Sequence, residues 1–273
     1  MQDPSKPFWF GDKKTKTVEI TNKKYSFFVA TPVHGDVSIH YMQACLNFQK
    51  HCMKHDILVS FQIMKSSLVT QGRNLCVSGF MESDHTHLLF IDSDIDFQTS
   101  SIFKMLAADK QVISVPYPLK QLMWDKAFHR MQNGDIKTVE DLKYKALHTY
   151  PMKVADDKNI TIKDGVIEVT HSPTGCMLIK REVIEKMIKA YPDTEIIQKS
   201  VINGELVNKP YMYNLFDTWY DPVNKTYMGE DFAFCKRWKD IGGKCYALVT
   251  DKITHAGEHQ YRGCFADELI KTK

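Results

Sequence analysis

The chain has 273 residues, of which 43% are hydrophobic and 25% are charged, and these proportions exclude a disordered chain or a fibre. Its 36 Lys and Arg residues nearly balance 33 Asp and Glu residues, so the formal net charge of +3 gives no reason to expect nucleic-acid binding. No apolar run approaches the ~20 residues that a helix needs to cross a bilayer, and residues 1–10 lack the apolar core of a secretory signal. We therefore expect one large domain, or else two small ones, without a membrane span.

The seven cysteines are odd in number and include no C-x-x-C pair. Most of them lie inside apolar segments, where cysteine behaves as a small hydrophobic residue. This pattern predicts a reducing compartment, with neither a disulfide framework nor a cysteine-rich zinc site. We therefore expect a cytoplasmic protein, in which the Asn-X-Thr sequences at Asn159 and Asn224 are chance matches.

Strand-like and helix-like segments alternate from residue 25 to about residue 120, after a polar, Lys-rich segment 1–24 that we expect to be a tail or an edge segment. Buried strands are predicted at 25–30, 57–64, 86–91 and 112–115, and helices at 39–53, 69–81 and 100–108. The first of these helices is indicated by the spacing of Ile39, Met42, Leu46 and Met53. The alternation predicts a mostly parallel sheet covered by helices on both faces. Loops 31–36 and 92–96 each follow a strand, so they should meet at the sheet edge where such folds bind ligands.

The second half of the chain is less regular between residues 121 and 170, where 160–169 is typical of a hairpin that turns at Asp164-Gly165. A strand at 174–179 and a helix at 181–190 follow, and residues 196–228 hold many turn residues and aromatics. The last helix should begin near Glu230 and end at Gly242-Gly243, a C-terminal cap signal, before a strand at 245–249.

Three aspartates, Asp92, Asp94 and Asp96, directly follow the predicted strand 86–91. Side chains at alternate positions of an extended segment point to one face, so three like charges would repel there unless a cation binds. Carboxylate oxygens suit the hard ions Mg²⁺ and Mn²⁺. The alternative explanation is a solvated turn that caps the following helix.

Glu230 and Asp231 open the last predicted helix. Acids in a first turn are favourable through capping and the helix dipole alone, and this structural role stands beside that of a general base.

His255 follows a predicted strand and could complete a metal site made by the aspartates, although a packed histidine is also compatible with the pattern. An i, i+4 zinc pair with His259 is disfavoured because Gly257 lies between the two and no H-E-x-x-H pattern exists.

Two further positions offer groups that recognise a nucleotide or a sugar. Arg73, next to Asn74, carries a planar fork that suits phosphate or a base edge, although a surface arginine is the commoner outcome. Among the aromatic residues of 211–227, Trp219 is the best candidate for a ring that stacks on a sugar. The chain has no P-loop, no G-x-G-x-x-G fingerprint and no G-x-S-x-G elbow.

Taken together, these segments resemble a GT-A nucleotide-sugar glycosyltransferase. They follow in the family's order: a strand into Thr31-Pro32, then Arg73-Asn74, LLFIDSDIDF (88–97), TGCMLIKREVIEKM (174–187), GEDFAFCKRWKDIGGK (229–244) and ITHAG (253–257). The resemblance covers about residues 25–262, and the compact form is similar to small glycosyltransferases of large DNA viruses and phages. It implies an α/β fold of GT-A type, with a mostly parallel central sheet flanked by helices and a smaller acceptor-side β element.

The resemblance also implies an organisation and a set of partners. Residues 25–273 would form a single domain, with a nucleotide-binding half, 25–120, and an acceptor-binding half, 121–273. The donor would be a UDP-sugar, the acceptor a glycan hydroxyl, and the cofactor Mn²⁺ or Mg²⁺. If the protein is viral, its place would be the host cytoplasm.

Roles for individual residues are implied by the same motifs. The nucleotide would be bound by Thr31, Pro32, Arg73, Asn74, Asp92 and Ser93. Asp92 and Asp94 would hold the metal ion, with His255 as a third ligand, while the extra acid Asp96 leaves open which two aspartates form the pair. Thr174, Gly175 and Trp219 would contact the sugars. Asp231, or else Glu230, would take the proton of the acceptor hydroxyl in an inverting transfer.

Three other functions stay open. A retaining glycosyltransferase of the same fold is favoured if Asp231 lies on the diphosphate side of the donor. A D-x-D metal phosphohydrolase usually has Thr or Val two residues after its second aspartate, where this chain has Asp96. A non-catalytic sugar-binding module would not need the three acids, the acidic pair and the downstream histidine.

Overall fold

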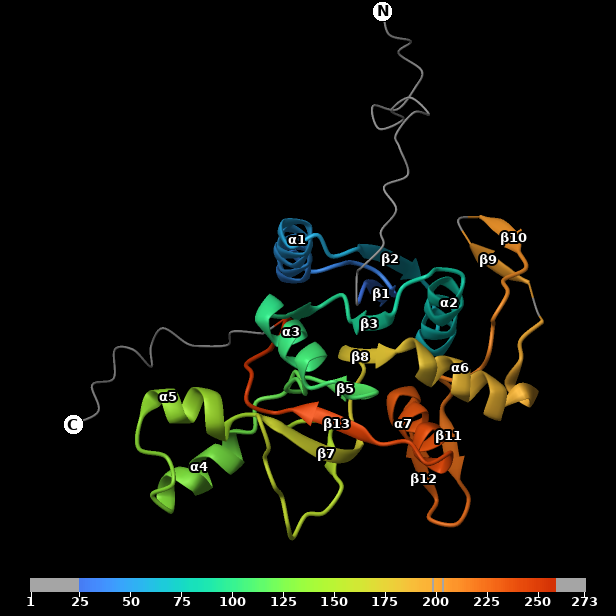
Figure 1. Ribbon diagram of the computed structural model, residues 1–273. Coiled ribbons are helices and arrows are strands. Elements are labelled where there is room, and N and C mark those ends of the chain that lie inside the picture. The colour runs from blue at the N-terminus through green and yellow to red at the C-terminus, as the bar shows by residue number, and fades with distance from the viewer. Residues whose placement is uncertain (1–24, 198, 203, 259–273) are drawn as a thin grey trace, which may run out of the picture.

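The computed structural model describes residues 25–197, 199–202 and 204–258 (Figure 1). The expected tail 1–24, together with His259 and Cys264, lies outside the described residues. The helices are α1 (Ile39–Lys54), α2 (Val69–Met81), α3 (Thr99–Ala107), α4 (Trp124–Gln132), α5 (Val139–Asp141), α6 (Arg181–Ala190) and α7 (Glu230–Asp240), with a π-helical turn at Leu142–Ala146 and a 3₁₀ turn at Pro192–Thr194.

The strands are shorter and more numerous. They are β1 (Phe27–Val33), β2 (Val59–Lys65), β3 (His87–Ile91), β4 (Ile95–Asp96), β5 (Val112–Ser114), β6 (Lys153–Val154), β7 (Val166–His171), β8 (Cys176–Lys180), β9 (Ser200–Ile202), β10 (Glu205–Val207), β11 (Trp219–Asp221), β12 (Thr226–Met228), β13 (Cys245–Leu248) and β14 (Thr254–His255).

Eight strands form one sheet in the order β2-β1-β3-β8-β5-β13-β7-β6, and three small ladders pair β9 with β10, β11 with β12, and β4 with β14. In the large sheet only β7 and β8 run against the common direction. The predicted α/β class, a mostly parallel sheet with smaller β elements, is therefore confirmed and is consistent with a GT-A-type fold.

Alternation along the buried strands assigns the helices to the two faces of the sheet. Phe28 and Ala30 of β1 pack in one core cluster with residues of α2, α6 and α7, whereas Phe27 and Val29 pack in a second cluster with residues of α1 and α3. Figure 1 shows these helices on opposite sides of the sheet. Because both faces are covered, the strands read as continuous apolar runs rather than alternating ones.

Two local predictions differ from the structure. The helix predicted at 39–53 is confirmed as α1, but Ile39, Met42, Leu46 and Met53 are exposed. The buried row of α1 consists of Tyr41, Ala44, Cys45, Phe48 and Cys52, which pack in one core cluster with residues of β1, β3 and α3. Thr31 and Pro32 belong to β1 rather than to a loop, since pairing with β2 continues to Val33.

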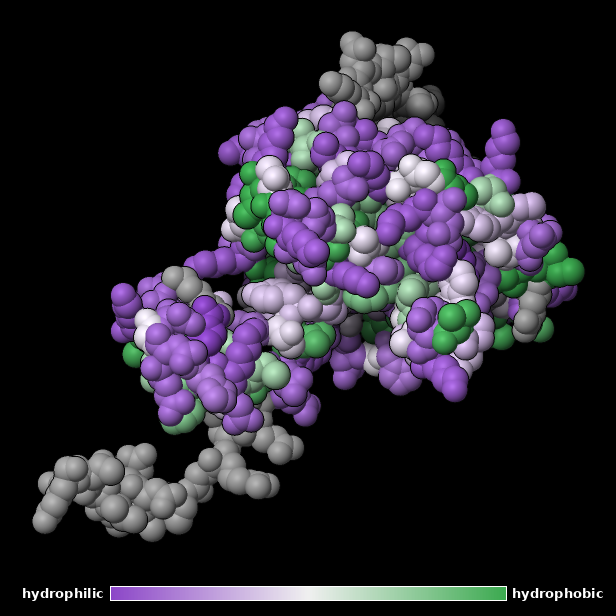
Figure 2. Space-filling model, turned by 90° about the horizontal axis from the view of Figure 1, so that it is seen from below, coloured by the Kyte–Doolittle hydropathy of each residue, from purple (hydrophilic) through white to green (hydrophobic). Residues whose placement is uncertain are grey.

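The irregular stretch 121–170 contains a feature that sequence patterns did not predict. α4, α5 and the π-helical turn form a lobe beside the sheet (Figure 1), held by a small core cluster of Ala127, Ile136, Ala146 and Leu147. From below, the surface of this lobe is mostly hydrophilic (Figure 2, left). The turn at Asp164-Gly165 forms as predicted, with positive φ at both residues, but only its second arm, β7, is a strand. In the described part of the chain, no helix has the length and apolar character required to cross a bilayer.

Candidate functional site

The carboxyl ends of β1, β3, β5 and β13 meet at one edge of the sheet because these four strands run in the same direction. The segments that follow β3, β5 and β13 carry the aspartates, the stretch 115–121 and His255 respectively. α2 and α7 bring further charged residues to this edge. The candidate site is therefore assembled from segments that lie far apart in the sequence.

Arg73 of α2 links two acidic segments of the site. Its guanidinium Nη2 lies 3.0 Å from Asp92 Oδ1, and its Nε lies 3.0 Å from Glu230 Oε1. The side chain is only 4% exposed. Burial alone would lower the pKa of Arg73, but the carboxylates of Asp92 and Glu230 raise it above its usual value. Its Nη1 is buried and has no hydrogen-bond partner among the described residues, so one donor remains available.

Asp94 contacts a second cation and a histidine. Its Oδ2 lies 2.5 Å from Lys120 Nζ and 3.3 Å from His255 Nε2. Burial opposes ionisation of Asp94, but its hydrogen bonds with His255 and Lys120 outweigh that effect and lower its pKa to about 2. His255 Nδ1 lies 2.9 Å from the carbonyl oxygen of Pro118, which can only accept, so Nδ1 carries a proton. A neutral ring would therefore have its lone pair at Nε2, on the Asp94 side, whereas the hydrogen bond to Asp94 needs a proton at Nε2 as well.

Asp231 has the opposite electrostatic environment. It lies in the first turn of α7, and its Oδ1 accepts a hydrogen bond of 2.7 Å from the backbone N–H of Phe232. Burial, reinforced by the adjacent charge of Glu230, raises the pKa of Asp231 to about 6. A carboxyl group with a pKa near neutrality can both accept and release a proton under ordinary conditions, as general catalysis requires.

Tyr117 lies against several of these groups. A Cβ atom added to Gly175 would collide with the Tyr117 ring and would lie 2.9 Å from Asp92 Oδ2, so only glycine fits there. The Tyr117 ring also packs edge-on against His255, with 4.8 Å between ring centres. Burial and the nearby charge of Asp92 raise the pKa of Tyr117 above its usual value. Gly257 has a similar role, because a Cβ there would lie 2.7 Å from Cδ of Lys120.

The three aspartates do not line one face, contrary to the expectation from an extended segment. Residues 92–95 form a turn, closed by a 3.1 Å hydrogen bond from Ile95 N–H to the Asp92 carbonyl. Asp92 therefore faces Arg73, Asp94 faces Lys120, and Asp96 lies in β4 beside a separate cavity. The Ser93 carbonyl accepts a 2.8 Å hydrogen bond from the N–H of Ser38, the N-cap of α1.

Other candidate residues make contacts of their own. The hydroxyl of buried Thr31 shares a 2.7 Å hydrogen bond with Tyr41, and Pro32 packs 3.1 Å from the Cβ position of Gly72, one residue before Arg73.

Three candidates are placed differently from the acids. Asn74 is 1% exposed, and its amide donates to Asn214 and accepts from the Phe216 backbone. Trp219 lies in β11, with Lys236 Nζ 4.3 Å from its ring centre. Thr174 is fully buried, and its hydroxyl has no partner among the described residues.

The acids and His255 supply part of the donor set that a divalent cation needs. Within the described ranges, no three His, Cys, Asp or Glu side chains converge on one point. Asp94 and His255 do converge, and the ammonium of Lys120 already places one positive charge on Asp94. The Pro118 carbonyl orients the His255 ring as carbonyls do for metal-binding histidines. Asp94 and His255 are thus two ligands of a possible set, while Asp92, two residues before Asp94, faces Arg73.

Sequence patterns did not single out Tyr117 and Lys120. Both belong to the segment that follows β5, a strand that was predicted at 112–115. Folds of this kind bind ligands at the carboxyl ends of their parallel strands. The position of Pro116 to Lys120 after a predicted strand could therefore have marked this segment as part of the site.

No family model matches the chain, and no curated protein matches it. Among solved structures, it is similar to "A197 from STIV", with a TM-score of 0.45 and 19% identity over 85% of this chain and 86% of that chain. It is also similar to "a glycosyltransferase involved in the glycosylation of the major capsid of PBCV-1", with a TM-score of 0.30 and 9% identity over 62% of this chain and 66% of that chain. The fold assignment rests on the strand order and directions given above.

Proposed function

We propose that this protein is a glycosyltransferase that uses Mn²⁺ or Mg²⁺ to transfer a sugar from a UDP-sugar to a hydroxyl group of a glycan, with inversion at the anomeric carbon. One observation carries the proposal: the same sheet edge holds Asp94, in contact with His255 and Lys120, and Asp231, in the first turn of α7, and these two environments lower the pKa of Asp94 and raise that of Asp231. Catalytic sites often contain two acid groups whose environments separate their pKa values. One group then stays charged and stabilises charge, while the other transfers a proton.

The charge balance of the site supports dependence on a cation. Four acids, Asp92, Asp94, Glu230 and Asp231, are matched by two permanent cations, Arg73 and Lys120. With Asp231 ionised the excess is negative, so a diphosphate would meet repulsion unless a divalent ion binds with it.

In this proposal Asp92 and Asp94 hold the cation, and His255 offers Nε2 as a further ligand. When bound, the ion would neutralise the charge that develops on the departing diphosphate. Arg73 keeps Asp92 and Glu230 in place, and its buried Nη1 offers a donor to the nucleotide. Asp231 accepts the proton of the attacking hydroxyl, and Glu230, held by Arg73, supplies the charge that keeps Asp231 basic enough.

Isothermal titration of the protein with UDP, in the presence and absence of Mn²⁺, tests the proposal. Binding that requires the metal is expected for the native chain. Asp94→Asn should abolish that binding, because it removes a ligand charge while preserving the shape of the side chain. Asp157→Asn, a change at an exposed aspartate of a surface loop, is the matched control. Equal UDP binding with and without Mn²⁺ would contradict the proposed role of the aspartates.

A further inference from the structure

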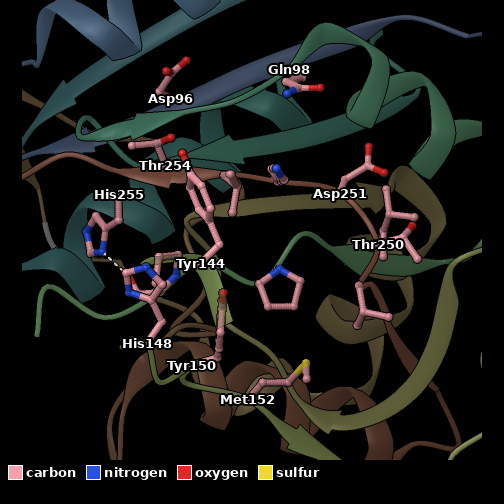
Figure 3. A pocket seen from close by; sticks show the side chains of 16 residues that line it. Asp96, Gln98, Tyr144, His148, Tyr150, Met152, Thr250, Asp251, Thr254 and His255 are labelled. Atoms are coloured by element: carbon pink, nitrogen blue, oxygen red, sulfur yellow. Dashed lines mark hydrogen bonds between the residues drawn. The ribbon is translucent and has the colours of Figure 1, made fainter. Parts of the chain in front are cut away.

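A separate cavity of about 720 Å³ lies beside the candidate site, between the segment that follows the π-helical turn and the chain from β13 to β14 (Figure 3). Its size falls within the range of small-molecule sites, roughly 300–1,000 Å³. Figure 3 shows Asp96 and Gln98 at one end of the cavity and His148, Tyr150 and Met152 at the other. Nothing in the proposed chemistry of the acids uses this space.

The walls of the cavity are rich in flat rings. Tyr144, His148 and Tyr150 line it together with Pro116 and Pro118. Tyr144 is 47% exposed and Tyr150 is 46% exposed, so both side chains of this lining keep about half of their surface accessible. Aromatic rings of this kind offer an apolar face and a polar tip to a ligand. A sugar ring has the complementary form, with C–H bonds on its faces and hydroxyl groups around its rim.

The polar groups of the cavity also suit hydroxyl groups. His148 Nδ1 is buried and has no hydrogen-bond partner among the described residues. A buried ring nitrogen without a partner is rare in folded proteins and calls for a ligand or a water molecule. Gln98 and Thr254 add neutral donors and acceptors to the lining.

The charges of the lining disfavour a phosphorylated ligand. Among the described residues of the lining, Asp96 and Asp251 carry carboxylates and Lys252 carries an ammonium group. Lys252 Nζ lies 4.8 Å from the centre of the Tyr144 ring. Asp251 is engaged by Lys104 and Ser101. None of the described residues that line the cavity is an arginine, so these residues do not provide the fork that phosphate groups favour.

The cavity is joined to the candidate site by the small β4–β14 ladder. His255 lines the cavity and also approaches Asp94, and Thr254 pairs with Asp96 across the ladder. We propose that this cavity is a carbohydrate-binding subsite, in which Tyr144, His148 and Tyr150 hold a neutral sugar unit of the acceptor glycan. The assignment of this sugar to the acceptor glycan rests on the proposed function, whereas sugar binding at these rings does not.

Ligand-observed NMR by saturation transfer tests the subsite with the full chain. The probes are methyl glycosides of glucose, galactose, mannose, fucose, rhamnose, xylose and N-acetylglucosamine, and free uridine. Saturation is expected on the ring C–H protons of at least one glycoside. Absence of transfer to every glycoside would overturn the proposal, and so would displacement of the bound glycoside by uridine, which would identify a nucleoside site instead.

Two substitutions assign the binding to the cavity. Tyr144→Ala and Tyr150→Ala should each weaken glycoside binding by about tenfold, because each removes a ring face. Tyr150→Phe keeps the ring and should bind within about threefold of the native chain. Tyr220→Ala, at a 56% exposed tyrosine of β11 outside the cavity, is the matched control and should bind normally. Unchanged binding in both cavity variants, with their thermal unfolding intact, would overturn the proposal.

Failure of the subsite and failure of the proposed function give different results. Tyr144→Ala should keep Mn²⁺-dependent UDP binding while it loses the glycoside. Glycoside binding at the rings without any UDP binding would refute the transferase and leave the subsite standing. UDP binding that needs Mn²⁺, without any glycoside signal, would refute the subsite and leave the transferase standing.

Discussion

Replacement of Asp231 by asparagine should stabilise the protein while it removes the proposed base. The pKa of this carboxyl group rises from 3.8 to about 6 on folding, mainly because the group is buried. The folded state therefore holds the proton more tightly than the unfolded state, and ionisation costs stability that grows as pH rises from 3.8 to about 6. At about 1.4 kcal/mol for each pH unit, the cost above pH 6 is about 3 kcal/mol.

Asparagine has no charge to bury, and its amide oxygen can keep the hydrogen bond from Phe232 N–H. We therefore expect Asp231→Asn to raise the free energy of unfolding by up to about 3 kcal/mol at pH 7.5 and by less than about 1 kcal/mol at pH 4. Urea unfolding of both proteins at the two pH values measures the difference. If the native protein and Asp231→Asn have the same free energy of unfolding at pH 7.5 and at pH 4, the carboxyl group is not desolvated. That result would refute the reasoning that makes Asp231 a base.

Three other changes follow from the contacts of the site. Arg73→Met leaves two carboxylate partners uncompensated and should lower the free energy of unfolding by about 3 kcal/mol, whereas a loss below about 1 kcal/mol in urea would contradict the ion-pair network. Gly175→Ala should displace Tyr117 and abolish Mn²⁺-dependent UDP binding in titration calorimetry; normal binding would show that the ring has no bearing on the site. Lys120→Met removes a partly exposed ammonium from Asp94 and should tighten Mn²⁺ binding by up to about fivefold, as calorimetry with the metal alone would measure, while weaker binding would count against competition at that carboxylate.

The fold was predictable where burial leaves a strong local pattern. Segments such as β3, in which every position from Leu88 to Ile91 is apolar, have the short apolar run that is typical of a strand covered on both faces. The orientation of α1 was not predictable, because the helix carries two apolar rows and composition does not decide which one meets the sheet. Its packed row contains Tyr41 and Phe48 beside the smaller Ala44, Cys45 and Cys52, and the partners that cover this row come from distant parts of the sequence. The lobe around α4 was missed because its core cluster is very small.

The site was predictable only in part, because local motifs show some of its residues and the partners of these residues lie far away in the sequence. The aspartates and the acidic pair of α7 are local motifs, and the sequence shows them directly. Their partners are not local: Arg73 and Glu230 are 157 positions apart, and Lys120 reaches Asp94 from another strand end. The structure brings Arg73, the acids, Gly175 and His255 to one edge, while Asn74 and Trp219 make other contacts.

The distribution of cations among the acids decides which acid can do which task. Arg73 binds both Asp92 and Glu230, so the arginine that joins the two motifs also holds Glu230 in an ion pair. Asp231 has a different environment, because burial, with the neighbouring charge of Glu230 as the second cause, raises its pKa to about 6. Two adjacent acids of one helix turn therefore differ in their partners: Glu230 is bound by Arg73, and Asp231 accepts a hydrogen bond from the backbone N–H of Phe232. This difference favours Asp231 over Glu230 as the base.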